Sequence, residues 1–183
     1  MTDLLRKSPL ARFLDAGRLG LISAFVTEVH GVEGTLIAQG NTPAGLYFLS
    51  AGVVEVRESG TAAALARLEA PQVFGEMAFL TGGHASASVE ICEPVSGVAI
   101  SFAEMNRLLT HEPEVGALVM TFLAKTLAHR LATTNQHLKR MERGTQSERL
   151  GLSALEEAQL DEGFSAEFAS INLDEVWDAS FEL

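Results

Sequence analysis

Short apolar runs separated by glycine-containing turns fill the chain between residues 25 and 101. The runs are rich in Val, Ile, Phe and Leu, and the turn signals recur at intervals of roughly eight to twelve residues. No helical pattern separates the runs, so the segment is typical of a β-sandwich or barrel and not of alternating strands and helices. We expect strands at residues 26–29, 35–37, 46–49, 53–56, 64–68, 87–91 and 95–100.

Apolar residues at helical spacing lie on both sides of this segment. Residues 3–24 are expected to form short helices, because Ser8 followed by Pro9 is typical of an N-cap and a first helical turn. Residues 102–110 predict another short helix, and Pro113 can begin a long one that nothing interrupts from residue 114 to 142. At about 1.5 Å per residue this helix is roughly 43 Å long.

The long helix carries a heptad seam, in which spacings of four and three residues alternate. Two interpretations remain open: the helix packs wholly on its own domain, or its second half forms a two-helix dimer seam. The strict heptads favour the dimer, whereas apolar residues off the seam are expected to cover the β-domain. The covering residues are Val115, Leu118, Phe122 and Leu123, and the predicted seam residues are Met120, Ala124, Leu127, Leu131, Thr134, Leu138 and Met141.

Composition predicts one domain with an appendage, because 47% of the 183 residues are hydrophobic. The single cysteine, Cys92, excludes an internal disulfide and lies in an apolar strand, where we expect a buried, unreactive thiol. Charges interrupt the apolar residues at the N-terminus, and no unbroken apolar run approaches about 18 residues. We therefore expect a soluble, cytoplasmic protein that does not bind a membrane.

The formal net charge of −11 is concentrated in the C-terminal part of the chain. From residue 145 onward there are ten carboxylates and one arginine, and the first 144 residues have a net charge of only −2. This distribution disfavours nucleic-acid binding. We interpret residues 144–183 as an acidic tail, partly disordered or docked, with aromatic residues suited to docking. A basic cluster of Lys139, Arg140 and Arg143 precedes the tail, which predicts a salt-sensitive contact between them.

One segment, residues 74–89 with the sequence FGEMAFLTGGHASASV, is a candidate for ligand chemistry. Gly75 and Glu76 form a turn where backbone can approach a ligand, and free amides follow at the start of a short helix. With the hydroxyls of Ser86 and Ser88 these amides would cradle an anion, and the Glu76 carboxylate would accept hydrogen bonds from a sugar diol. Composition alone favours a plain hairpin with a capped helical turn.

The segment resembles the phosphate-binding cassette of cyclic-nucleotide-binding domains, the family of the catabolite activator protein, protein kinase A regulatory subunits and cyclic-nucleotide-gated channels. The family pattern is roughly F-G-E-[LM]-A-L-[LIMV]-x-x-x-x-R-[AS]-A-[ST]-V. Residues 40–56, GNTPAGLYFLSAGVVEV, are similar to the turn and strand pair that precede the cassette in the family. The resemblance implies a mainly β fold: an eight-stranded, cupin-like jelly roll with short N-terminal helices and a long C-terminal helix. It covers a domain at residues 1–143, with the jelly roll at about 25–101 and the long helix at about 114–142.

The resemblance also implies which residues hold the ligand. Glu76 and the backbone of Gly75 would bind the ribose 2′-hydroxyl. The amide of Ala78, with the amide and hydroxyl of Ser86, would face the cyclic phosphate. The candidate ligand-binding residues are Gly75, Glu76, Met77, Ala78, His84, Ala85, Ser86 and Ser88.

The chain departs from the family at the arginine that pairs with the exocyclic phosphate oxygens. Ala85 stands at this position, and no arginine lies between Arg67 and Arg107. The adjacent His84 cannot reproduce the two-pronged contact of a guanidinium group. Three interpretations remain open: the site binds a cyclic nucleotide weakly, it binds a different small effector, or it is silent in a protein used for interaction.

The resemblance therefore implies a non-enzymatic regulatory module that binds cAMP, cGMP or a related effector and signals through its C-terminal helix to a protein partner. The alternative is a degenerate site in an interaction subunit that acts through the long helix and acidic tail. We expect no DNA-binding output domain after the helix, because no helix-turn-helix pattern follows it. The sequence offers no catalytic candidate and no metal spacing among its five histidines, and we expect no cofactor.

Overall fold

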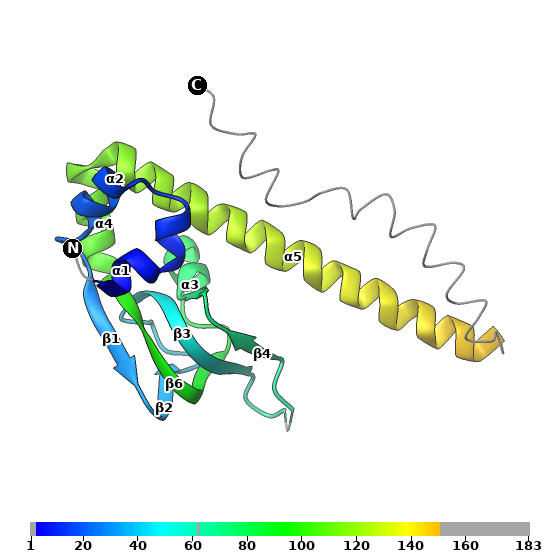
Figure 1. Ribbon diagram of the computed structural model, residues 1–183. Coiled ribbons are helices and arrows are strands. Elements are labelled where there is room, and N and C mark those ends of the chain that lie inside the picture. The colour runs from blue at the N-terminus through cyan, green and yellow to red at the C-terminus, as the bar shows by residue number, and fades with distance from the viewer. Residues whose placement is uncertain (1–2, 62, 151–183) are drawn as a thin grey trace. The chain divides into compact units, whose positions relative to one another are not determined.

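The computed structural model describes residues 3–61 and 63–150, without the side chains of His137 and residues 141–150 (Figure 1). The chain divides into two compact units, residues 1–127 and 128–183, and each is described by itself. The predicted acidic tail lies outside the described residues from residue 151 onward.

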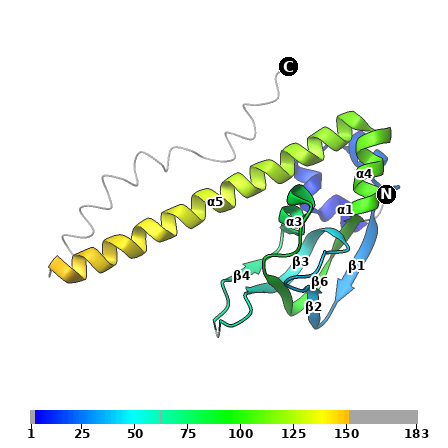
Figure 2. The same ribbon diagram turned by 180° about the vertical axis from the view of Figure 1, so that it is seen from behind.

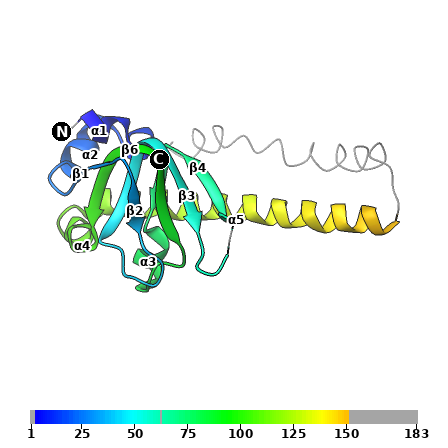
Figure 3. The same cartoon turned by 90° about the horizontal axis from the view of Figure 1, so that it is seen from below.

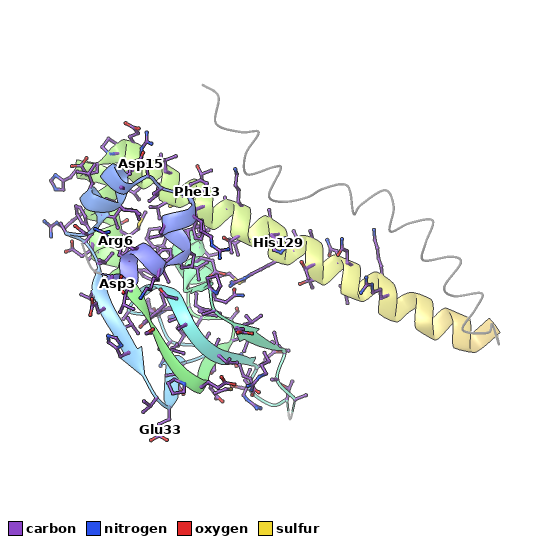
Figure 4. The ribbon with its side chains drawn as sticks, viewed as in Figure 1. Asp3, Arg6, Phe13, Asp15, Glu33 and His129 are labelled. Atoms are coloured by element: carbon purple, nitrogen blue, oxygen red, sulfur yellow. The ribbon has the colours of Figure 1, made fainter. Side chains whose placement is uncertain are left out.

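Three short helical elements open the chain, as predicted: α1 (Asp3–Lys7), the 3-10 helix η1 (Pro9–Arg12) and α2 (Ala16–Ile22). Ser8 takes the N-cap position of η1, but its hydroxyl donates to the Leu5 carbonyl oxygen at 2.7 Å and does not cap the helix. Asp15 caps α2 by accepting the backbone N–H of Arg18 at 2.8 Å. Figure 4 labels Asp3, Arg6, Phe13 and Asp15 in this group.

The β-domain is one antiparallel sheet of six strands, and Figure 3 shows its strands from below. The strands are β1 (Thr27–Gly31), β2 (Gly34–Ile37), β3 (Gly45–Arg57), β4 (Ala66–Glu69), β5 (Gln72–Phe74) and β6 (Ser88–Ser101). The central order is β1-β6-β3-β4, with β2 paired to β6 and β5 paired to β3. Glu33 marks the turn between β1 and β2 (Figure 4). The fold is mainly β, as expected.

The described residues form six strands, whereas the apolar runs predicted seven and the resemblance implied eight. Two pairs of the seven predicted strands are each continuous, and β5 was not predicted. In β3 the register shifts between Leu49 and Val54, around a bend at Gly52 with φ of +99°. A Cβ at Gly52 would lie 2.4 Å from the Pro94 carbonyl oxygen, so the bend requires glycine. One half of β3 pairs with β5 and the other with β4. Likewise β6 pairs with β1 and β2 along its two halves. The cupin-like arrangement stays a prediction.

Two helices follow the sheet. Helix α4 (Phe102–His111) is capped by Ser101, whose hydroxyl accepts the backbone N–H of Glu104 at 3.1 Å. Helix α5 (Pro113–Leu150) continues past both its predicted end at residue 142 and the predicted domain boundary at 143, which otherwise stays untested. Helices α1, α2 and α4 gather at one end of the sheet (Figures 1 and 2).

The first half of α5 belongs to the core of the first unit. Three of the four predicted covering residues are buried, Leu118 is half-buried, and Val119 is buried in addition. The Phe122 ring centroid lies 5.8 Å from that of Phe13 and 6.2 Å from that of Phe48. Arg18 donates to the Glu114 carboxylate at 2.6 Å, which joins α2 to the start of α5. Aromatic packing and an ion pair therefore fix this half of the helix on its own domain.

Helix α5 is long and apolar enough over Pro113–Arg140 to cross a membrane by length and composition alone. The sequence has no unbroken apolar run of this length, but an 18-residue stretch of α5 is apolar on average and contains no more than two charged residues. A core helix of a soluble protein passes the same test. Val115, Val119 and Leu123 are buried, but only 28% of the apolar stretch is buried in this structure.

Candidate functional site

The turn between β5 and α3 (Glu76–Thr81) forms the first part of the candidate site. Gly75 adopts the left-handed conformation, with φ of +88°. A Cβ at Gly75 would lie 2.4 Å from the carbonyl oxygen of Gly45. Any other residue would therefore strain the turn and collide with the start of β3.

Glu76 is the first residue of α3 and is only 3% exposed. It is the single buried carboxyl among the residues whose side chains the structure describes. Burying a carboxylate is costly unless hydrogen bonds compensate it, so carboxylates are seldom placed inside a domain without a role. The structure therefore holds the Glu76 carboxylate away from bulk water, directly after the Gly75 turn.

The short helix α3 presents backbone amides next to Glu76. Its first intrahelical hydrogen bond runs from the Phe79 N–H to the Gly75 carbonyl oxygen at 3.0 Å, so the helix does not use the Ala78 amide. Ala78 is buried, whereas Met77 is half exposed at 50%. The helix ends at Gly82, which is left-handed with φ of +66°.

Residues 84–86 form the second part of the site and are held by the loop before β3. The Ala85 N–H donates to the Asn41 carbonyl oxygen at 2.8 Å, and the Gly40 N–H donates to the Ala85 carbonyl oxygen at 2.9 Å. The Ala85 side chain packs against the buried cluster of Ile37, Leu49, Val54, Phe74, Val89 and Val95. The residue that replaces the family's arginine is therefore half-buried, with its methyl group in contact with the edge of this cluster.

The two serines of the cassette have different roles. Ser86 is exposed, and its hydroxyl makes only a weak contact with the Met77 sulfur at 3.9 Å, which joins the two parts of the site. The Ser88 hydroxyl accepts the backbone N–H of Gln39 at 3.0 Å and so helps to fix the preceding loop. His84 is exposed, with Nδ1 3.3 Å from the Thr42 hydroxyl.

The loop at residues 39–42 was missing from our predicted site residues, although it lies within a segment that resembles the family. Gln39, Gly40 and Asn41 each bond to the cassette through backbone atoms. The available signal was Gly40, which is left-handed with φ of +79°. Because these contacts use backbone atoms, they do not depend on side-chain identity, and the sequence gives no other sign of them.

The nearest arginine by strand register does not replace the missing one. Arg57 is the register partner of Ser88, but it lies 3.3 Å from the Glu90 carboxylate and also hydrogen-bonds to Glu55. The bond from Arg57 holds the pKa of Glu55 below its usual value. Arg67, on the next strand, pairs with Glu55 and Glu93. Both cations near the cassette are therefore engaged with carboxylates.

Our prediction for Cys92 was wrong, because its thiol is exposed. Residues alternate between the faces of a strand, so Cys92 shares the outer face of β6 with Glu90. Of the predicted seam, Leu131 and Leu138 are 63% and 53% exposed. Met120 and Leu127 are half-buried, Ala124 and Thr134 are exposed, and the side chain of Met141 lies outside the description.

Comparison with known proteins identifies the domain. Residues 33–112 match the family model described as "Cyclic nucleotide-binding domain". A comparison with curated proteins gave no match.

Several solved structures share the fold. A cyclic nucleotide-binding domain from Methylobacillus flagellatus is 19% identical with a TM-score of 0.66, over 76% of this chain and 80% of that one. A protein from Geobacter metallireducens that is described as a putative cyclic nucleotide-binding protein is 21% identical, with a TM-score of 0.60, over 72% of this chain and 99% of that one. The Thermus thermophilus catabolite activator protein is 27% identical with a TM-score of 0.59, over 74% and 63%. Residues 33–112 therefore match the cyclic nucleotide-binding domain family, and the fold agrees with this match.

Proposed function

We propose that this domain is a non-enzymatic sensor that binds cAMP or cGMP with low affinity between the β5–α3 turn and residues 84–86. The observation that carries the proposal is the buried Glu76 carboxylate, which follows a left-handed glycine pressed against Gly45. A structural carboxylate would more easily lie at the surface.

The chemistry of the site suits a ribose and a cyclic phosphate. A ribose hydroxyl would donate to the Glu76 carboxylate, and charge-assisted hydrogen bonds of this kind are among the stronger ones. The Ala78 amide and the Ser86 hydroxyl would donate to phosphate oxygens. Met77, His84, Ala85 and Ser88 complete the candidate set through packing and through the shape of the loop.

The proposal specifies low affinity because Ala85 supplies no positive charge. Removing one partner of a buried, hydrogen-bonded charge pair typically costs about 2–5 kcal/mol, or roughly 30- to several-thousand-fold in affinity. The two nearby arginines are engaged with carboxylates. A cyclic nucleotide would therefore depend on Glu76, the Ser86 hydroxyl and backbone donors, without a cationic partner.

A chain of contacts within the first unit supports output through α5. The Phe79 ring on α3 lies 5.2 Å, centroid to centroid, from the Phe102 ring on α4. Helix α4 ends at His111 and α5 begins at Pro113. A shift of α3 would therefore move α4 and, through it, the start of α5. We propose that this movement is read by a protein partner and not by nucleic acid, in a cytoplasmic protein.

We also propose a homodimer through the heptad positions of α5. The exposed Leu131 and Leu138 are the apolar residues that a second helix would cover. The alternative of a silent site requires that this helix and the acidic tail act without any ligand.

Isothermal titration calorimetry with cAMP and cGMP up to millimolar concentration tests the ligand directly. We expect measurable heat and a raised melting temperature, both reduced in the Glu76→Gln variant. Absence of heat and of a thermal shift at millimolar ligand contradicts the proposal. The silent-site alternative then predicts that Glu76→Ala leaves partner binding unchanged.

A further inference from the structure

Two large apolar side chains on α5 lie in one stripe of the second unit. Leu131 and Leu138 are 63% and 53% exposed. They are seven residues apart, so they lie two helical turns apart along the axis and only about 20° apart around it. Exposed leucines aligned on one side of a helix are typical of a face that another segment covers.

Basic residues border this stripe. Residues 128–140 contain Arg130, Lys139 and Arg140 and no carboxylate. Arg130 precedes one leucine and Lys139 follows the other, which places them about 100° of rotation away on opposite sides of the stripe. His129 marks the beginning of this part of α5 in Figure 4. The surface is therefore an apolar line with a cation on each flank, and we call it the α5 stripe.

The segment of opposite chemistry is the C-terminal part of this same chain. Residues 151–183 contain nine carboxylates and no lysine or arginine. They also contain four aromatic residues spaced among the acids, Phe164, Phe168, Trp177 and Phe181. Apolar rings would cover the leucines while the carboxylates meet the flanking cations.

Charge favours this segment over a second copy of the helix. Two α5 stripes face to face would bring Arg130 and Lys139 of one chain towards the same two cations of the other, and like charges across a helix interface are destabilising. The segment is also long enough, since Leu138 lies about 18 Å from Leu150 along the helix. Each extended residue spans roughly 3.3 Å, so the aromatic residues can return to both leucines.

We propose that residues 151–183 bind the α5 stripe of their own chain and so compete with a second copy for the predicted dimer seam. This inference goes beyond the proposed function, since it concerns assembly and does not depend on any ligand. Self-association would then require release of the acidic segment.

Trp177 is the only tryptophan of the protein, so its fluorescence reports on this segment in the unmodified full-length chain. At low salt we expect its emission to be blue-shifted relative to the urea-unfolded chain and several-fold less accessible to acrylamide. Molar salt should reverse part of this protection, because screening weakens the ionic contacts and leaves the apolar ones.

The double variant Leu131→Asp with Leu138→Asp should restore the emission and quenching of the unfolded chain. Thr133→Asp with Gln136→Asp is the matched control, because both residues are exposed on the opposite side of the helix. The control should keep the wild-type emission at equal helix content by circular dichroism. Arg130→Glu with Lys139→Glu, which retains both leucines, should remove only the salt-sensitive part of the protection.

Three results would overturn the proposal. The first is a wild-type Trp177 that is as accessible to acrylamide as in urea. The second is a protected Trp177 that the two Leu→Asp changes leave untouched. The third is a protection that rises with protein concentration while light scattering shows a dimer, because a second copy then occupies the stripe. A monomer protected at every concentration supports the proposal.

Discussion

Ala85 and Asn41 are joined by a backbone hydrogen bond of 2.8 Å, from the Ala85 N–H to the Asn41 carbonyl oxygen. A second bond returns from the Gly40 N–H to the Ala85 carbonyl oxygen. The backbone at the position of the family's arginine is therefore held at the cassette although the arginine is absent. The Cα of any residue introduced at position 85 would therefore be held at a fixed place in the cassette.

The first prediction follows from this anchoring. Ala85→Arg should strengthen cAMP binding by roughly 30-fold or more, since it restores a charged partner worth about 2–5 kcal/mol to the phosphate. Calorimetric titration of the variant and the wild type measures the change. Thr110→Arg adds the same charge at an exposed position on α4 and should leave the affinity unchanged. Equal gains in both variants would show that net charge, and not the position, is responsible.

The second prediction concerns the buried carboxylate and is best measured in the Ala85→Arg background. Glu76→Gln should weaken cAMP binding by about 10- to 100-fold, because hydrogen bonds to a charged acceptor contribute about 1.5–3 kcal/mol. Glu104→Gln, which removes a carboxylate from α4, is the control. An unchanged affinity in Glu76→Gln would remove Glu76 from the ligand site.

The elements and the cassette were accessible to prediction because both depend on local patterns. Apolar runs and turn signals located every strand except β5, whose three residues are too few to show a period. Strand continuity was not accessible, because the bend at Gly52 depends on the approach of Pro94 from another strand. The end of α5 was misplaced because Gly144 costs a helix only about 1 kcal/mol and does not stop it.

The candidate site was predictable in its residues and not in their roles. Sequence could not distinguish Ser86 from Ser88, because the difference lies in a bond from the distant Gln39 amide. Nor could it show that Cys92 faces outward, since an apolar strand has two faces and only pairing decides which is covered. Long-range contacts determined each of these outcomes.

The third prediction tests the turn that positions Glu76. Gly75→Ala should lower the free energy of unfolding by more than about 2 kcal/mol, because it combines a left-handed backbone with a Cβ 2.4 Å from the Gly45 carbonyl oxygen. Gly60→Ala is the matched control: its φ is +87°, yet no atom lies within 4 Å of the added Cβ. Urea unfolding should rank Gly75→Ala well below Gly60→Ala. Equal losses would mean that the close approach contributes nothing.

The fourth prediction concerns pH. The backbone N–H of Arg18 lowers the pKa of Asp15, so folding favours the charged form of this exposed carboxyl. Its contribution to stability is therefore present above the unfolded pKa of about 3.9 and is lost as the pH falls through the lower folded value. Asp15→Asn should flatten the fall of the melting temperature between about pH 5 and pH 3. Asp3→Asn is the control in the same region of the chain, and an identical flattening there would contradict the assignment to Asp15.

The fifth prediction tests the path from the cassette to α5. Ligand bound to the Ala85→Arg protein should slow hydrogen exchange in α4 and in the first turns of α5, because the Phe79 ring bears on the Phe102 ring at 5.2 Å. Phe79→Ala in the same background removes this contact and should keep the protection in α3 while losing it in α4 and α5. Phe25→Ala, at a half-buried aromatic outside the path, controls for general loosening. If protection still reaches α5 without the Phe79 ring, the movement travels through β3 and the Phe48–Phe122 contact instead.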